Sequence, residues 1–276
     1  MGEALIHPTA IVSEGARIGE DVRVGPYSIV EAGSSIGRGS ILEAYIRIRE
    51  HVEIGCDCHI YENAVLGGIP QDHDFKGEVS YVRIADDVVI RENVTIHRAT
   101  GEGSQTFVGR GTMLMEGVHL GHNVHVGVEC TVANKTGLSG HVKVGDYAVV
   151  SGLTGFHQFV HVGSYAMVGG LAKIIKDVPP YSMVDGHPGR VYGLNTVGLR
   201  RRGFSQEERN RIKHAYKILY DKTLSRKQAL ELLRELADGD EFAREIVAFV
   251  ESSRRGLSPW AEFAAHHGSV GTDPAV

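Results

Sequence analysis

The residues best suited to chemistry are histidines gathered in one stretch of the chain. Six of the 15 histidines lie between residues 119 and 161, at His119, His122, His125, His141, His157 and His161. Histidine is the usual general base near neutral pH, and it is also a common zinc ligand. Which chemistry applies depends on which of these side chains meet in the folded chain. That in turn depends on the elements that carry them.

A strict six-residue repeat carries these histidines. From Ile6 to Ile174, 26 of 29 positions spaced six residues apart hold a large apolar residue, whereas chance, at 42% of 29 positions, would give about 12. Neither a helical nor a two-residue strand period produces this spacing. The repeat predicts a left-handed parallel β-helix with three flat faces and about 18 residues in each coil. Gly often follows the repeat position, and we expect it to permit a positive φ at the turns.

The coil length predicts which residues are neighbours. Adjacent coils lie about 4.8 Å apart, so residues 18 apart should stack. His122 then lies one coil from Gly140, and Gly140 lies one coil from Gln158. His141 and His157 fall on the same edge, so we expect one patch of histidines there. A separate column is expected from His125, Lys143 and His161.

A histidine beside a bare glycine amide suits acyl transfer. His122 could deprotonate the attacking hydroxyl, and the Gly140 N–H could donate to the oxyanion of the tetrahedral intermediate. Spacing alone leaves open that these are exposed histidines without a function. A zinc site is the rival interpretation. Steps of three residues from His119 to His125 would point the rings in different directions on a six-residue face, so no metal is expected.

The composition excludes several classes of protein. A net charge of −5 argues against a nucleic-acid binder. Three cysteines, Cys56, Cys58 and Cys130, form neither a disulfide framework nor a zinc site, and we expect them to be buried apolar residues. No apolar run approaches the roughly 20 residues of a membrane helix. The N-terminus lacks the features of a signal peptide, so a cytoplasmic location is expected.

Two parts of the chain are expected. Residues 1–190 should form the β-helix, with loops at 67–82 and 97–107 where the repeat is interrupted. Residues 191–276 should form a helical domain that covers the open end of the β-helix. One helix should follow the Ser205 capping box, a second should begin near Ser225, and a third should span 241–253. We expect a flexible tail from about Gly256.

Six segments of the chain carry a recognisable pattern. They are IRENVTIHRAT (90–100), LMEGVHLGHNVHVG (114–127), LSGHVKVGD (138–146), GFHQFVHVGSYAMVGG (155–170), DVPPYSMVDGHPGR (177–190) and GLNTVGLRRRGFS (193–205). These segments resemble the acyl-carrier-protein-dependent UDP-N-acetylglucosamine O-acyltransferases, and the likeness extends from about residue 5 to 255. The resemblance implies a homotrimer that performs the first step of lipid A biosynthesis. The donor would be a hydroxyacyl chain on acyl carrier protein, with no other cofactor.

The resemblance also implies roles for single residues. His122 matches the general base that takes the proton of the sugar 3-hydroxyl, and Gly140 matches the oxyanion donor. Gly170 matches the position that limits acyl length, and a glycine there implies a longer chain. Substrate-binding positions are matched by Gln71, Asp72, His119, His141, His157 and Gln158. Nucleotide contacts from the adjoining subunit are matched by Asn195, Arg201 and Arg202.

The chain departs from the family pattern at a few positions. Asn123 stands where an aspartate is familiar, so a charged partner for the base is missing there. His73 and Asp74 alter the charge beside Asp72, and Val197 replaces an acidic residue. An N-acyltransferase acting on a 3-amino sugar and a CoA-dependent acetyltransferase remain alternatives. A third alternative, from a different functional class, is a scaffold protein without enzymatic activity.

Overall fold

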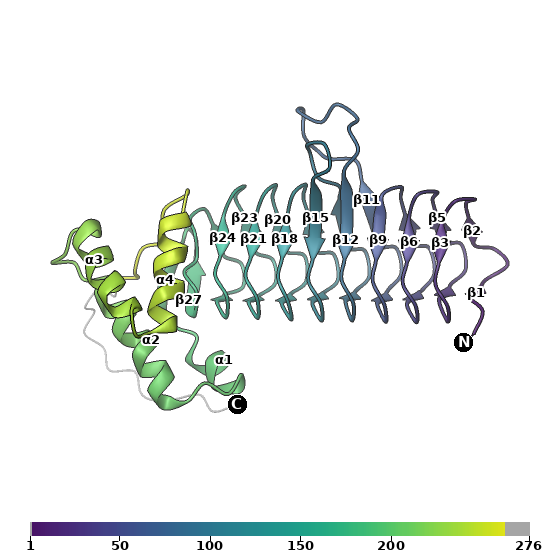
Figure 1. The fold of residues 1–276 in the computed structure, drawn as a ribbon. Helices are drawn as coiled ribbons and strands as arrows, with labels where there is room; N and C mark the ends of the chain where they lie inside the picture. The colour runs from purple at the N-terminus through teal and green to yellow at the C-terminus, as the bar shows by residue number, and fades with distance from the viewer. Residues whose placement is uncertain (1, 263–276) are drawn as a thin grey trace.

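The computed structural model describes residues 2–262, which form a left-handed parallel β-helix followed by helices (Figure 1). Each coil contributes one short strand to each of three sheets. Sheet A consists of β1 (Leu5–Ile6), β4 (Arg23–Val24), β7 (Ile41–Leu42), β10 (His59–Ile60), β13 (Val89–Ile90), β16 (Met113–Leu114), β19 (Thr131–Val132), β22 (Val149–Val150), β25 (Met167–Val168), β27 (Ser182–Gly186) and β28 (Gly189–Leu194).

The other two sheets complete the coils. Sheet B consists of β2 (Ile11–Val12), β5 (Ile29–Val30), β8 (Arg47–Ile48), β11 (Val65–Gly68), β14 (Thr95–His97), β17 (His119–Leu120), β20 (Gly137–Leu138), β23 (Gly155–Phe156) and β26 (Lys173–Ile174). Sheet C consists of β3 (Arg17–Ile18), β6 (Ser35–Ile36), β9 (Val52–Ile54), β12 (Tyr81–Ile84), β15 (Gln105–Val108), β18 (His125–Val126), β21 (Lys143–Val144) and β24 (His161–Val162). The predicted fold class is confirmed.

The core is the stack of repeat-position side chains. Val30, Ile48 and Leu66, for example, are completely buried. Burying one such side chain contributes about 1.5–3 kcal/mol before entropy is counted. The small residues two positions earlier are also inside, as Ser28 and Ala148 show. The apolar stack along the axis therefore holds the coils together.

The expected role of the repeated glycines was wrong. Except at Gly67, the glycine after the repeat position does not take a positive φ. The left-handed residue comes two positions later, as at Tyr147 and Asn123. Glycine is needed for close approach instead. A Cβ on Gly37 would lie 2.5 Å from the backbone of Gly55 in the next coil. The coils thus approach too closely at this edge to admit a side chain.

The two interruptions project together from one edge of the β-helix (Figure 1). They are shorter than predicted, because the flanking strands extend into them. The first joins β11 to β12 through residues 69–80, and the second joins β14 to β15 through residues 98–104. They are tied to one another, since the Gly101 N–H donates to Glu78 Oε1 at 2.7 Å.

The chain after the coils differs from the prediction in three places. The β27–β28 hairpin extends sheet A as far as Leu194, beyond the expected boundary at 190. A short helix α1 (Thr196–Arg201) then follows, which the sequence did not reveal. Residues 256–262 are not loose, because Leu257 and Trp260 form bridges with Asp177 and Val191. The rest of the expected flexible tail lies outside the described residues.

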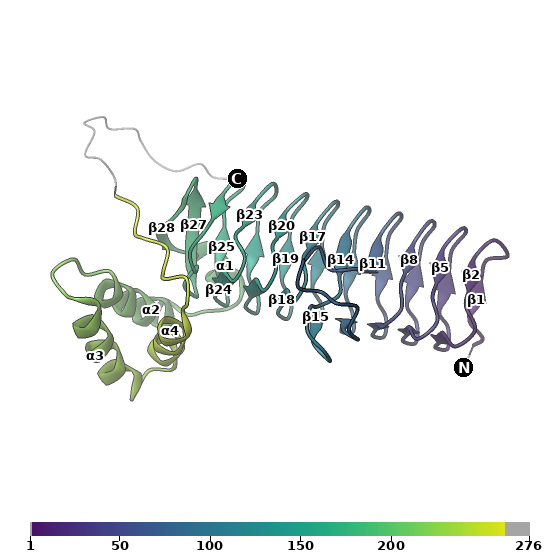
Figure 2. The ribbon, with the colours of Figure 1, turned by 90° about the horizontal axis from the view of Figure 1, so that it is seen from above.

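Three longer helices lie beyond the last coils (Figures 1 and 2). They are α2 (Gln206–Leu219), α3 (Arg226–Ala237) and α4 (Glu241–Ser252). The first two begin with capping boxes at Ser205 and Ser225, as expected. None of the helices within residues 2–262 is long and apolar enough to cross a membrane.

Candidate active site

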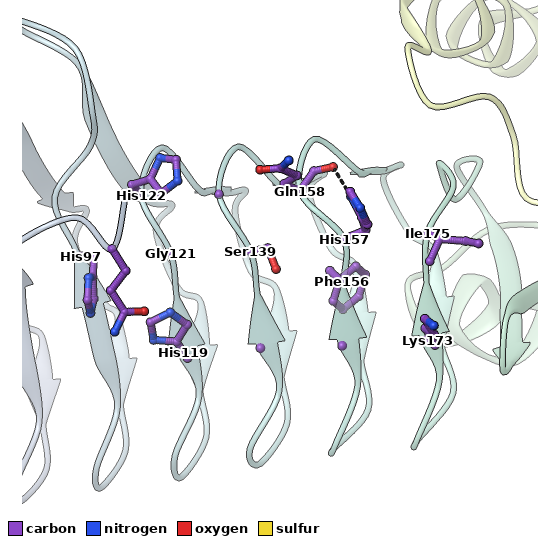
Figure 3. Close-up of a pocket in the computed structure, with 14 residues that line it drawn as sticks. His97, His119, Gly121, His122, Ser139, Phe156, His157, Gln158, Lys173 and Ile175 are labelled. Atoms are coloured by element: carbon purple, nitrogen blue, oxygen red, sulfur yellow. Dashed lines mark hydrogen bonds between the residues drawn. The ribbon is translucent and has the colours of Figure 1, made fainter. Parts of the chain in front are cut away.

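A groove of about 690 Å³ runs along the outer side of sheet B, where that sheet meets the turns to sheet C (Figure 3). Consecutive coils supply its residues, so the fixed spacing of parallel strands sets their separation. The lining residues are Gln71, His97, His119, Gly121, His122, Gly137, Ser139, Gly140, Gly155, Phe156, His157, Gln158, Lys173 and Ile175. The structure therefore brings most of the predicted site residues together.

His122 and Gly140 lie in direct contact on adjacent coils. A Cβ built on Gly140 would be 2.3 Å from His122 Nε2, so only glycine leaves room for the ring. The His141 N–H donates to the His122 carbonyl at 3.0 Å, which keeps the two turns in register. The Gly140 N–H donates no hydrogen bond within residues 2–262. It is thus available to a ligand beside the imidazole.

Asn123 orients the imidazole of His122. Its Oδ1 lies 2.8 Å from His122 Nδ1 and also accepts the Thr100 N–H at 3.0 Å. Its Nδ2 donates to the Thr100 carbonyl at 3.0 Å. These two bonds to Thr100 fix which end of the amide faces the ring, so Nδ1 carries the proton. Nε2 is left with a lone pair for a substrate proton.

Asp72 approaches the other ring nitrogen from the first loop. Its Oδ2 lies 3.7 Å from His122 Nε2 and accepts the Thr100 hydroxyl at 3.2 Å. The hydrogen bond from the Asp74 N–H lowers the pKa of Asp72 below its ordinary value. The carboxylate is therefore ionised at neutral pH. The structure shows Asp74 acting on Asp72 through this backbone N–H at 3.1 Å.

The other predicted histidines surround the base. The ring of His141 stands edge-on to that of His122 at 5.1 Å and stacks on Phe159. His119 Nδ1 lies 2.8 Å from the Thr95 hydroxyl. Burial, and then the neighbouring histidine, lower the pKa of both His119 and His141. Both rings are accordingly neutral at pH 7 and can accept as well as donate hydrogen bonds.

Sequence reasoning missed His97 and the floor of the groove. His97 is in register with Gly121 on the next coil. The two residues are 24 positions apart, and not 18, because the second loop lengthens this coil. Burial lowers the pKa of His97, and its Nδ1 has no hydrogen-bond partner within residues 2–262. The floor includes Gly137 and Gly155, where an added Cβ would meet nothing within 4 Å. Both glycines occupy the outward position just before the buried residue of their strand, and this position in the repeat could have indicated them.

Four predicted residues lie away from the groove. Asn195, Arg201 and Arg202 line a second cavity of about 650 Å³ over sheet A, with Tyr147 and Tyr165. The Asn195 amide accepts the Gly198 N–H and donates to the Tyr165 carbonyl.

Arg202 in that cavity is already paired. Its guanidinium lies 2.6 Å from Glu129 and covers the Tyr147 ring. Gly170 is on the opposite edge of sheet B, where an added Cβ would lie 3.5 Å from the Gly152 carbonyl.

The remaining expectations concern cysteines and metals. Cys58 and Cys130 are buried as expected, and burial raises the pKa of each thiol to about 11. Cys56 is partly exposed, because it lies at a turn. No group of three or more His, Cys, Asp or Glu in the described part of the chain is placed to hold a metal ion. The absence of a metal from the reaction remains a prediction.

Comparison with known proteins assigns the family. A curated relative from Thermodesulfovibrio yellowstonii, an acyl-[acyl-carrier-protein]–UDP-N-acetylglucosamine O-acyltransferase, is 44% identical over 91% of this chain and 98% of its own. The chain belongs to this acyltransferase family. A second member, from Saccharophagus degradans, is 41% identical over 91% of this chain and 98% of its own.

The family assignment covers both parts of the fold. The crystal structure of a Francisella novicida UDP-N-acetylglucosamine acyltransferase superposes with a TM-score of 0.90 at 38% identity, covering 92% of this chain and 94% of the other. A family model described as UDP N-acetylglucosamine O-acyltransferase, domain 2, matches residues 177–258. That range holds the β27–β28 hairpin and all four helices, so the acyltransferase family accounts for the helical part as well as the coils.

Proposed function

We propose that the protein transfers a hydroxyacyl chain from acyl carrier protein to the 3-hydroxyl of UDP-N-acetylglucosamine, the first step of lipid A biosynthesis. The relatives named above carry this activity in their names. One observation in the site supports it most directly. The imidazole of His122, with a lone pair on Nε2, touches Gly140 on the next coil, and the Gly140 N–H donates no hydrogen bond within residues 2–262.

The geometry fits acyl transfer step by step. Nε2 of His122 accepts the proton of the sugar 3-hydroxyl while the oxygen attacks the thioester carbonyl. The Gly140 N–H donates to the oxyanion that forms. When the C–S bond breaks, the imidazolium returns the proton to the leaving thiolate. One base and one amide are therefore enough to balance the reaction.

Asp72 compensates for the neutral Asn123. An amide accepts the Nδ1 proton, but it adds no charge to stabilise the imidazolium. The ionised carboxylate 3.7 Å from Nε2 supplies a negative charge from the opposite side of the ring. The same carboxylate can accept a hydroxyl of the sugar, in keeping with the family's sugar-binding position. Thr100 holds this arrangement, because it contacts both Asp72 and Asn123.

The decisive test is turnover of UDP-N-acetylglucosamine with a panel of hydroxyacyl carrier proteins. We expect His122→Ala to lower kcat by at least about 100-fold. A 3-amino sugar acceptor and acyl-CoA donors belong in the same panel, with products identified by mass spectrometry. Wild-type turnover only with acetyl-CoA, or only with the amino sugar, would replace the proposal by that alternative.

We further propose a homotrimer whose sites are shared between subunits. Asn195, Arg201 and Arg202 lie over sheet A, away from the groove on sheet B. These nucleotide-binding positions can reach His122 only from a neighbouring copy. Mixing tests this. Co-expressed His122→Ala and Arg201→Ala chains should regain activity that neither homo-oligomer has. A monomeric mass in sedimentation, or no recovery on mixing, would contradict the shared site.

A further inference from the structure

The column of residues that contains the base continues beyond the groove. His122, Gly140 and Gln158 stand on consecutive coils, and the next residue in this column is Lys176. The backbone bonds from His141 to His122 and from Phe159 to Gly140 keep the column in register. Figure 3 shows its direction, from His122 past Gln158 to Ile175, which is the last lining residue at this edge.

A second depression lies where the groove ends. Its volume is about 340 Å³, and helices α2, α3 and α4 form one wall of it. Two cations line it, Lys176 from the column and Arg226 from the first turn of α3. Its other lining residues are Leu219, Leu224, Ala229, Leu230, Val250, Gly256 and Leu257. The depression therefore combines an apolar wall with two positive charges.

A third cation stands between the groove and the depression. Arg255 donates from Nε to the Ile175 carbonyl at 3.1 Å, which fixes the guanidinium beside the groove. The segment that carries Arg255 is held beside the end of the column by a backbone hydrogen bond, in which the Asp177 N–H donates to the Gly256 carbonyl at 2.9 Å. Residues about eighty positions apart in sequence thus meet at the end of the groove.

No carboxylate neutralises these cations within residues 2–262. Lys176, Arg226 and Arg255 form no ion pair there. Asp177 is adjacent in sequence, but it is 1% exposed. Its two oxygens accept the His161 N–H and the Ser253 hydroxyl. The depression therefore keeps a net positive charge that suits an anionic ligand.

The distances match the arm of the acyl donor. In pantetheine, about 13 bonds separate the thioester sulfur from the phosphate, which is roughly 15 Å when extended. Lys176 is two coils beyond Gly140, or about 10 Å along the axis. Its side chain can extend about 6 Å further. The diphosphate of a sugar nucleotide begins only about 5 bonds, or about 6 Å, from the sugar 3-oxygen.

We propose that Lys176 and Arg226, with Arg255 beside them, bind the phosphate that joins the phosphopantetheine arm to its carrier protein. This assignment rests on the proposed function, since it takes the donor to be an acyl carrier protein. An arm lying along the column would bring its thioester to Gly140 and its phosphate to the depression. The carrier protein itself would then dock against helices α2 and α3.

The test compares three donors of one hydroxyacyl chain, borne on carrier protein, on phosphopantetheine and on pantetheine. We expect Lys176→Gln/Arg226→Gln to raise KM about five- to tenfold for the two donors that carry a phosphate. KM for the pantetheine donor and for UDP-N-acetylglucosamine should stay within about twofold. Arg17→Gln/Arg23→Gln removes two exposed charges from the far end of the β-helix and is the matched control.

The remaining outcomes overturn the assignment in different ways. A rise in KM for UDP-N-acetylglucosamine would assign the cations to the nucleotide. An effect confined to the complete carrier protein would place them on a protein surface and not on the phosphate. If the double variant and the wild type had the same KM for every donor and for UDP-N-acetylglucosamine, these cations would not form a binding site. Should the double variant fail to fold, Lys176→Glu and Lys176→Arg provide the same comparison, with the arginine expected to retain binding. Failure of the wild type with every donor would reject the proposed function itself.

Discussion

Substituting Gly140 by alanine tests the geometry on which the mechanism rests. The new methyl would lie 2.3 Å from His122 Nε2, whereas ordinary contacts begin at 3.4 Å. The difference is 1.1 Å, so the imidazole must move by about that distance. A displacement of about 1 Å in a catalytic group lowers the rate by roughly 100-fold. We therefore expect kcat to fall by about 100-fold, or about 2.7 kcal/mol in the activation barrier.

The same substitution should change the folding stability very little. The displaced ring loses its hydrogen bond to Asn123, worth about 0.5–1.5 kcal/mol. Gly140 does not have a positive φ, so alanine fits the backbone. Replacing glycine by alanine at such a position stabilises a protein by about 0.4–1 kcal/mol. The two effects nearly cancel, so the melting temperature should move by only a few degrees.

The assay is steady-state turnover with hydroxyacyl carrier protein, beside thermal unfolding of the same samples. Gly239→Ala is the control, because an added Cβ there meets nothing within 4 Å and the residue is remote from the groove. It should keep full activity. Gly140→Ala with a native melting curve and a kcat within about threefold of wild type would refute the reasoning. It would mean that the ring either does not act as the base or moves without cost.

Three further predictions concern the loop, the acyl chain and pH. Thr100→Val removes the hydroxyl that holds Asp72, so KM for the sugar nucleotide should rise several-fold. Thr100→Ser keeps the hydroxyl and should keep the wild-type KM. An unchanged KM in Thr100→Val would show that Asp72 needs no such support. Gly170→Met should shorten the preferred acyl chain, as seen in a donor-length series, and an unaltered preference would reject Gly170 as the limit. Burial lowers the pKa of five histidines below the ordinary 6.5, so the unfolded chain binds more protons as pH falls through that value. The five are His97, His119, His125, His141 and His161. Stability should be complete above pH 6.5 and decline below it, and a melting temperature at about pH 5.5 equal to that at pH 7.5 would contradict this.

The repeat alone determined the coils and the contact between the base and Gly140. In a β-helix the same number of residues returns the chain to the same edge, so sequence spacing becomes distance in space. The neighbours His122, Gly140 and Gln158 follow from that spacing without coordinates. The helix starts at Ser205 and Ser225 were likewise readable, because a capping box is a local pattern.

Only the tertiary structure decided what the interruptions and the chain's end contribute. The loops break the period, so Asp72 and Thr100 reach His122 by contacts that no spacing predicts. Except for Gly67, the glycines that follow the buried residues are required by the neighbouring coil and not by their own φ, and one strand cannot reveal this. The pairing of Asp177 with Gly256 joins segments far apart in the chain. Such contacts depend on how whole elements meet, and the residues of each element taken alone do not encode them.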